Sequence, residues 1–588
     1  MRAADYVLSP VRALKAAGWR WSPTAIAAVL LLSMIAFLVT YPLIRMVAAV
    51  VSDATGSAGL GIDGSIWKVL WNTLLVVGGG SAAALVFGSA LALINERTDG
   101  GFRGLGNFLP VAPLMLPSIT GVLGWVVLFD PRVGLVNVIL RSLFGFAGSA
   151  GEGPINIYSM PGLVFATAIH LVPTIYLVVA AALRNLDPSI EEASRTFGAG
   201  PLQTAVRVTL PAIRPALFEG WLLSLINGIG MFSVPVILGT GARIELVSVR
   251  IWSYLTSFPS NVPGALVLAG GMLLVVLALR AAQARLIPPG RQATIGGRGV
   301  RSSPTRLGAL RYVTRTMIVG YILLSLVLPV LALMLVSLEP FWTASVRWDK
   351  LSFANYASVL TQNPATYRAL FNSLFLAGIG ATIATAVASY LMLYAHQRRA
   401  HGRGRGRKRP SRRPAAGFRA VVDFVTSLPT TLPHSLIGVS FILAFSQWPL
   451  DLYGTIWVLL LAYLTMEIPY AAAAARSATS MIGHELTEAS RIFGATSGAT
   501  MRKILFPLVL PGIAAGWVLV FIHILGEVTA SAILSGNANP VVGSVLLDLW
   551  RQGSFPIMTA FALVIWLIAS VLVVLMLRLN SQNLGKAQ

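Results

Sequence analysis

The sequence predicts an all-α membrane protein in which twelve transmembrane helices form two tandem six-helix repeats. Three observations predict this fold. The chain is 56% hydrophobic and only 11% charged, with a mean hydropathy of +0.76, which is typical of a protein whose solvent is mostly lipid. Twelve apolar runs are long enough to cross a bilayer. Finally, EASRTFGA at 192–199 returns with one substitution as EASRIFGA at 488–495.

A bilayer core of roughly 30 Å needs about 20 apolar residues in each helix, and we expect twelve such helices. The first run follows a basic stretch but is too long for the apolar region of a signal peptide, so we interpret it as a retained signal anchor. The first half contains the predicted spans 24–47, 69–94, 107–129, 158–183, 210–237 and 263–283. The second half contains 314–338, 368–395, 420–446, 454–478, 509–535 and 556–578.

The distribution of Lys and Arg predicts the orientation, because positively charged loops stay on the cytoplasmic side. With both termini inside, 34 of the 44 Lys and Arg fall in the inner loops, the two tails and the adjoining helix ends. We therefore expect both termini, and both EASR segments, in the cytoplasm.

The duplication extends over most of the chain. A constant offset of 296 pairs Pro173 with Pro469 and Trp221 with Trp517, and an offset of 300 pairs 70–74 with 370–374. Two repeats of the same orientation are the simplest explanation. The predicted boundaries are residues 1–283 for the first repeat, 284–311 for a basic Pro- and Gly-containing linker, and 312–588 for the second repeat.

Each EASR segment has the pattern of a short helix that ends in a sharp turn. Asp187 is a typical N-cap before Pro188, and Gly198 permits the left-handed conformation that ends a helix. One interpretation is an amphipathic helix lying at the membrane surface. A surface that meets the same partner twice explains the pattern better, because polar residues are kept in register as well as apolar ones. The apolar face is predicted to contain Ile190, Ala193 and Phe197 in the first copy and Leu486, Ala489 and Phe493 in the second.

The pattern resembles the EAA loop of permease subunits of binding-protein-dependent ABC importers. Both copies fit it, and the resemblance covers most of both halves, including AsnThr at 72–73, AsnSer at 372–373 and TyrGlyThr at 453–455. The fused double length and GlyGluValThrAlaSer at 526–531 resemble ferric-iron type permeases most, with thiamine, aminoethylphosphonate and polyamine permeases close by.

The resemblance implies a type I ABC importer permease in a bacterial inner membrane. Its loops would form coupling helices that dock two copies of a cytoplasmic ATPase, while a periplasmic or lipid-anchored binding protein delivers the solute. ATP and Mg would bind to the ATPase subunits, and this chain would bind no cofactor and catalyse no reaction. The sequence agrees with an external motor, since it contains no GxxxxGK[ST] phosphate loop. The coupling residues carried over are Glu192, Ala193, Ser194, Gly198, Glu488, Ala489, Ser490 and Gly494.

Polar residues inside the predicted spans are candidates for the solute pathway, because ionisable groups are costly at membrane depth. Glu527 lies in the eleventh span, and His523 is one helical turn earlier. Two interpretations stay open: Glu527 lines the pathway, or it pairs with His523 to hold helices together. No metal site is predicted, because the chain has no Cys and its six His are scattered. The predicted pathway residues are Glu527, His523 and Thr529, with Asn227, Met231 and Ser233 at the equivalent first-half positions.

The basic run at 401–410 is interpreted as a loop that fixes topology, with anionic lipid as an alternative partner and nucleic acid excluded for want of stacking aromatics. A secondary transporter is the distant alternative to the importer, and it leaves the duplicated EASR loops unexplained. A membrane-embedded enzyme has no carboxylate dyad or nucleophile set to support it. Ferric iron is the favoured solute; thiamine, aminoethylphosphonate and polyamine remain alternatives.

Overall fold

A computed structural model describes residues 23–54, 64–102, 109–145, 152–286, 305–403, 414–447, 450–480, 482 and 484–585 of the protein. Helices dominate this part of the chain, which confirms the predicted all-α class. The first half contains α2 (Pro23–Ala54), α3 (Ile66–Arg97), α4 (Ser118–Phe129), α5 (Leu135–Phe144), α6 (Met160–Asn185), α7 (Pro188–Thr196), α8 (Pro201–Thr204), α9 (Leu210–Ala212), α10 (Arg214–Gly230), α11 (Thr240–Ala242), α12 (Val247–Thr256) and α13 (Val262–Leu286). The second half contains α14 (Leu310–Ile322), α15 (Leu328–Leu338), α16 (Ala354–Ala357), α17 (Pro364–Arg403), α18 (Pro414–Ser427), α19 (His434–Phe445), α20 (Ile456–Ser480), α21 (His484–Ile492), α22 (Ser497–Thr500), α23 (Phe506–Leu525), α24 (Thr529–Leu534), α25 (Val542–Arg551) and α26 (Phe555–Gly585).

Nine helices in the described part of the chain are long and apolar enough to cross a membrane. Three further predicted spans are bent pairs rather than single helices, so the number reaches twelve if each pair counts as one span. The bends measure 100° between η1 (Leu109–Met115) and α4, 52° between α10 and Pro235–Ala242, and 93° between Phe418–Thr430 and α19. Hydropathy alone did not reveal these breaks, because each run stays apolar through its bend.

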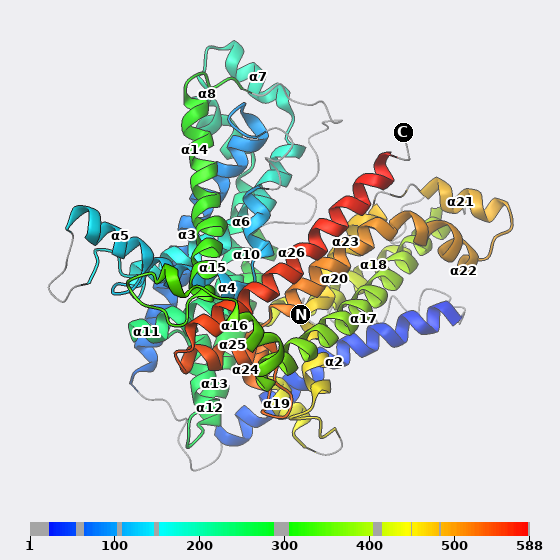
Figure 1. The fold of residues 1–588 in the computed structure, drawn as a ribbon. Helices are drawn as coiled ribbons and strands as arrows, with labels where there is room; N and C mark the ends of the chain where they lie inside the picture. Colours follow the sequence, from blue (N-terminus) through cyan, green and yellow to red (C-terminus); the bar gives the residue numbers. More distant parts are fainter. Residues whose placement is uncertain are drawn as a thin grey trace.

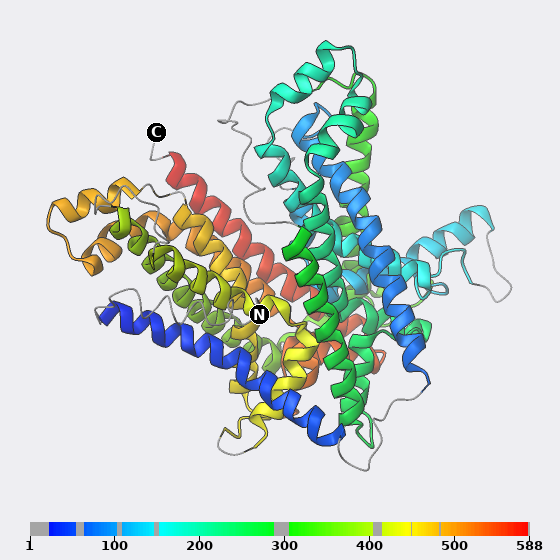
Figure 2. The same ribbon diagram turned by 180° about the vertical axis from the view of Figure 1, so that it is seen from behind.

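The two halves converge at one end of the molecule and diverge toward two separate tips (Figures 1 and 2). One tip is formed by α7 and α8, and the other by α21 and α22. Contacts between α12 and α24 join the halves where they converge. The two copies of the EASR segment therefore lie at the two tips.

The first membrane span of each half, α2 and the span that ends with α15, packs against the other half. Helix α2 contacts α17, α18, α19 and α20 of the second half, and α15 contacts α4 of the first. The Tyr41 hydroxyl donates to the Ala444 carbonyl at 3.3 Å, and its ring meets Phe445 edge-on at 6.0 Å. Trp125 Nε1 likewise donates to the Leu324 carbonyl at 3.0 Å. This exchange makes a single body from the two repeats.

Two glycines lie where bent segments of opposite halves meet. A Cβ on Gly526 would lie 3.0 Å from the Cβ of Pro117, whereas a Cβ on Gly230 would lie 3.5 Å from that of Pro433. The two contacts are related by the internal repeat, since Gly230 and Gly526 are 296 residues apart. The breaks of the two halves therefore meet at the centre of the molecule.

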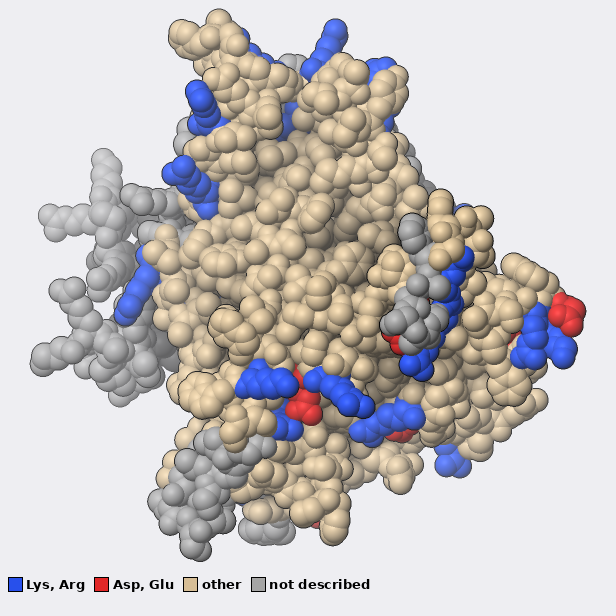
Figure 3. Space-filling view, turned by 90° about the vertical axis from the view of Figure 1, so that its left-hand side faces the viewer, with Lys and Arg blue, Asp and Glu red and all other residues tan. Residues whose placement is uncertain are grey.

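The surface has the character expected of a protein in lipid. Lys and Arg gather at the upper end of the view in Figure 3 and in a row lower down, with a broad uncharged area between them. Large apolar side chains are exposed along the spans. In a membrane this exposure costs no free energy, because lipid tails are as apolar as the side chains. On α3 these include Trp67, Trp71, Leu74, Val86 and Phe87.

The predicted linker 284–311 lies between the end of α13 and the start of α14. Its residues 287–304 fall outside the described part of the chain, as do residues 404–410 of the basic run, so the domain boundaries and the role of that run stay predictions.

Candidate functional site

The first loop, residues 187–209, begins with the helix that the sequence predicts. Asp187 caps α7 by accepting a hydrogen bond from the Ser189 N–H at 2.9 Å, and Pro188 occupies the first helical position. The same hydrogen bond holds the pKa of Asp187 below its usual value. A charged cap at a helix N-terminus also interacts favourably with the helix dipole.

The end of α7 turns sharply at a glycine. Gly198 has a φ of +85°, where a side chain would be strained. The Phe197 N–H donates to the Ala193 carbonyl at 3.1 Å, and the Ala199 N–H donates to the Ser194 carbonyl at 3.2 Å. These bonds satisfy helix carbonyls that would otherwise lack partners.

The second loop, residues 484–505, repeats this geometry at the other tip. Gly494 has a φ of +79°, and the Phe493 and Ala495 N–H groups donate to the carbonyls of Ala489 and Ser490 at 3.2 Å and 3.1 Å. The two loops therefore share a backbone conformation as well as a sequence.

The structure divides the predicted coupling residues into two groups. Ser194 and Ser490 point inward, where their hydroxyls lie 3.1 Å from Thr204 Oγ1 and 2.8 Å from Thr500 Oγ1, and brace each loop against its next helix. The other side chains face outward. The exposed residues are Glu192, Ala193, Glu488 and Ala489.

Each loop presents a large aromatic side chain to solvent. Phe197 is 92% exposed and Phe493 is 89% exposed, and both belong to the apolar faces that the sequence predicts. Leu202 and Ile492 are exposed beside them. Next to Phe197, a shallow hollow of about 500 Å³ is lined by residues 200–203, Val206 and Arg207. Exposed apolar side chains outside the spans are typical of surfaces that meet a protein partner or the membrane surface.

A buried polar cluster behind the first loop was missed by sequence reasoning. Glu191 is only 3% exposed and accepts a hydrogen bond from Thr209 Oγ1 at 2.7 Å, while Arg97 Nε lies 3.4 Å away. The only sequence signal was the doubled acid at 191–192, which becomes ThrGlu at 487–488 in the second copy.

Glu527 lies at the central helix break, not within a continuous helix. The predicted span 509–535 is wrong in this respect, because α23 ends at Leu525 and α24 begins at Thr529. The carboxylate caps α24: it accepts from the N–H groups of Thr529 at 2.8 Å, Ala530 at 3.0 Å and Ser531 at 3.0 Å. The first N–H groups of a helix have no carbonyl partner within the helix, and the Glu527 carboxylate supplies one.

His523 does not pair with Glu527, which corrects one of the two interpretations left open above. The chain turns at Gly526, so helical spacing no longer places these side chains on one face. Glu527 Oε1 lies 3.6 Å from His434 Nδ1, at the start of α19. His523 Nδ1 lies instead 3.2 Å from Glu467 Oε2 on α20. Both acids thus serve contacts between helices.

The remaining pathway residues are distributed around the same breaks. Thr529, Met231 and Ser233 are buried, and Asn227 is exposed on α10. The Met231 carbonyl accepts a hydrogen bond from Ser248 Oγ at 2.8 Å. The described residues contain no cluster of three or more His, Cys, Asp or Glu that could hold a metal ion. A role of these residues in a solute pathway stays a prediction.

Known proteins that resemble this chain match it in both halves. The family described as binding-protein-dependent transport system inner membrane component matches residues 84–290 and again residues 409–583. The ferric transport system permease protein of Actinobacillus pleuropneumoniae is 25% identical over 92% of this chain and 75% of its own length. A putative ferric transport system permease protein of Haemophilus influenzae is 26% identical, with 84% and 76% covered. A putative 2-aminoethylphosphonate transport system permease protein of Salmonella choleraesuis is 30% identical over 35% of this chain and 73% of its own length.

Proposed function

The chain belongs to the family of binding-protein-dependent transport system inner membrane components, and from this premise we propose that it forms the complete translocation pathway of an ATP-driven ABC importer. It is a multi-pass inner-membrane transport subunit, and the family matches it twice, once in each half. With two permease units in one chain, no second permease subunit would be needed to complete the pathway. We propose that both termini face the cytoplasm.

One observation carries the proposal: two loops with the same backbone geometry present an exposed Glu, Ala and Phe at equivalent positions on two separate tips. A partner that recognises one loop therefore fits the other as well, which favours two copies of one cytoplasmic ATPase. Phe197 and Phe493 would enter apolar pockets of that partner, where buried aromatic side chains contribute most of the binding energy of an interface. Hydrolysis of ATP would take place on the partner.

Ferric iron is the solute that we propose, delivered by a periplasmic or lipid-anchored binding protein. The names of the full-length relatives support iron. Two buried carboxylates, Glu527 at the central break and Glu467 on α20, each beside a histidine, would also favour a cationic solute over an anionic one. Protonated polyamines and thiamine carry positive charge too, and aminoethylphosphonate carries both signs, so they remain alternatives. Uptake of each solute by proteoliposomes with the cognate binding protein distinguishes them.

The docking surface can be tested by a double substitution, Phe197→Asp/Phe493→Asp. Both side chains are almost fully exposed, so the fold should survive, while the ATPase should no longer co-purify and stimulated ATP hydrolysis should fall to the background. Phe353→Asp is a matched control, because Phe353 is 75% exposed between α15 and α17, far from both loops in sequence. If the double variant keeps full ATPase association, the docking surface is wrong. If an ion gradient alone drives uptake, the protein is a secondary transporter.

A further inference from the structure

The buried cluster behind the first loop joins elements that are distant in the sequence. Arg97, Glu191 and Thr209 are 7%, 3% and 2% exposed and come from the end of α3, from α7, and from the turn η2 (Ala205–Thr209). Arg97 Nη2 also donates to the Leu186 carbonyl at 3.0 Å, just beyond the end of α6. These contacts join four elements, and removing one partner of such a buried pair would leave an uncompensated charge.

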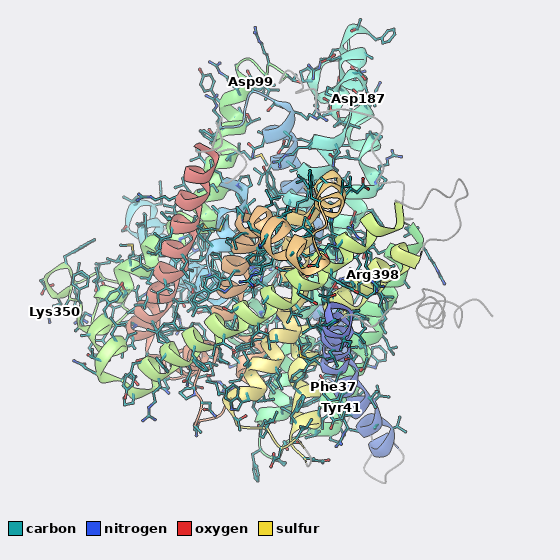
Figure 4. All side chains as sticks on the ribbon, turned by 90° about the vertical axis from the view of Figure 1, so that its right-hand side faces the viewer. Phe37, Tyr41, Asp99, Asp187, Lys350 and Arg398 are labelled. Atoms are coloured by element: carbon teal, nitrogen blue, oxygen red, sulfur yellow. The ribbon has the colours of Figure 1, made fainter. Side chains whose placement is uncertain are left out.

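Arg97 also contacts the end of the linker that leads into α14. Its carbonyl accepts a hydrogen bond from the Thr305 N–H at 2.9 Å, and the Asp99 N–H donates to the Thr305 carbonyl at 3.1 Å. Asp99 Oδ1 in turn accepts from the Leu307 N–H at 2.9 Å, three residues before α14 begins. Figure 4 shows Asp99 and Asp187 at the same end of the molecule, with Asp99 next to α14. A continuous path of bonds thus runs from the first loop to the first helix of the second half.

The second half lacks these charges at the matching positions. In the register of the repeat, Arg97, Glu191 and Thr209 correspond to Gln397, Thr487 and Leu505. Gln397 and Leu505 are buried like their counterparts. Among the described side chains at this end of the second half, Asp423 of α18 pairs with Arg476 of α20 at 3.0 Å and with Arg419 at 3.5 Å. The ion-paired attachment of the first loop therefore has no counterpart at the matching positions of the second half.

We propose that Arg97, Glu191 and Asp99 are positioning residues that pass movement of the first loop to both halves. The two docking sites would then contribute unequally to the conformational change that the ATPase drives. The inference rests on the proposed function, since it assumes that an ATPase moves the loops. When the first loop moves, the Arg97–Glu191 contact moves α3 and α6 with it. The bonds of Thr305 and Leu307 then carry the movement to α14. Such transmission needs a contiguous set of packed and hydrogen-bonded groups, which this path provides.

The first test gives the first half the residues that the second half already uses, Arg97→Gln/Glu191→Thr/Thr209→Leu. Because the same set occurs at the equivalent positions 397, 487 and 505, we expect the variant to fold. The ATPase should still co-purify, because the exposed residues of the loop are unchanged. Solute imported per ATP hydrolysed should fall about three- to thirty-fold in proteoliposomes. A loss of stability alone would lower the amount of active protein but not this ratio.

Two outcomes of this test would overturn the inference. An unchanged import ratio would mean that the cluster transmits nothing, and loss of ATPase association would mean that it only shapes the docking surface. Failure of the proposed function is distinguishable, because then the wild type itself would show no ATPase association.

The second test separates the two ends of the path. Asp99→Ala removes the side-chain bond to Leu307 and leaves Glu191 and its partners untouched, and it should lower the import ratio without affecting ATPase association. Glu152→Gln is the control, because it breaks the exposed Arg132–Glu152 pair in another loop and should change nothing. Adding Gln397→Arg/Thr487→Glu/Leu505→Thr to the first triple variant should not restore coupling. Restored coupling, or a full ratio in Asp99→Ala, would overturn the link to α14.

Discussion

Single residues were predictable where their role depends on near neighbours in the chain. Asp187 is the predicted N-cap, and Gly198 and Gly494 adopt the left-handed conformation that the stop signal indicates. The partners of ionisable residues were not predictable in the same way. Glu527 meets His434, 93 residues earlier, and only the three-dimensional arrangement brings them together. Glu191 was missed for the same reason, because its partner Arg97 lies on another span.

The second loop offers a direct test of the role of its turn. Gly494→Ala forces a side chain into the left-handed region at φ +79°, which costs about 1–2 kcal/mol for a residue with a Cβ. No atom lies within 4 Å of the added Cβ, so the strain is in the backbone alone. Amide exchange of residues 484–500 should therefore become roughly 5–30 times faster, as judged by hydrogen–deuterium exchange.

Gly498→Ala is the matched control for this substitution. Gly498 lies four residues away within α22, also has no atom within 4 Å of the added Cβ, and should gain helix propensity. Equal exchange rates in the two variants would contradict the assignment of Gly494 as the turn that fixes the loop.

At the scale of helices, the spans themselves were predictable and their breaks were not. The predicted spans correspond to apolar helices or bent pairs, apart from 509–535, which runs past α23 into α24, because length and hydropathy report membrane crossing directly. A bend leaves hydropathy unchanged when the residues at the bend are apolar, as in LeuPro at 116–117 and 432–433. Breaks at proline are tolerated in membrane helices, because neighbouring groups form hydrogen bonds with the backbone groups that the break frees.

The two central glycines should differ in their tolerance of a methyl group. Gly526→Ala places a Cβ 3.0 Å from the Pro117 ring, which is tighter than ordinary contact, and such overpacking costs about 1–3 kcal/mol. Gly230→Ala reaches only 3.5 Å from Pro433, which is normal van der Waals contact. In detergent, Gly526→Ala should therefore lower the midpoint of thermal unfolding clearly, whereas Gly230→Ala should leave it nearly unchanged. The reverse order would show that the breaks do not meet as described.

At the scale of the molecule, the internal duplication predicted two similar halves, and the family match to both halves confirms it. The family itself was also predicted correctly from the EASR segments. The exchange of α2 and α15 between the halves was not predictable, because a repeat offset describes sequence similarity between the halves and contains no information on how they pack together. It appears in contacts such as that of Tyr41, which is labelled in Figure 4, with Ala444 and Phe445.

The exchange predicts how the halves behave when the chain is cut within residues 287–304. Each half expressed alone leaves helices without their packing partners, and association of helices in lipid depends on that packing and on hydrogen bonds between helices. We expect the separate halves to be unstable alone, and to co-purify and restore import when produced together.

Tyr41→Ala in the first half should weaken co-purification, because it removes the bond to Ala444 and the contact with Phe445. Leu30→Ala, on the exposed side of the same helix, is the control and should have no effect. If Tyr41→Ala captures the second half as well as the unaltered first half does, then α2 does not hold the two repeats together, and the interface around α4 and α15 must do so alone.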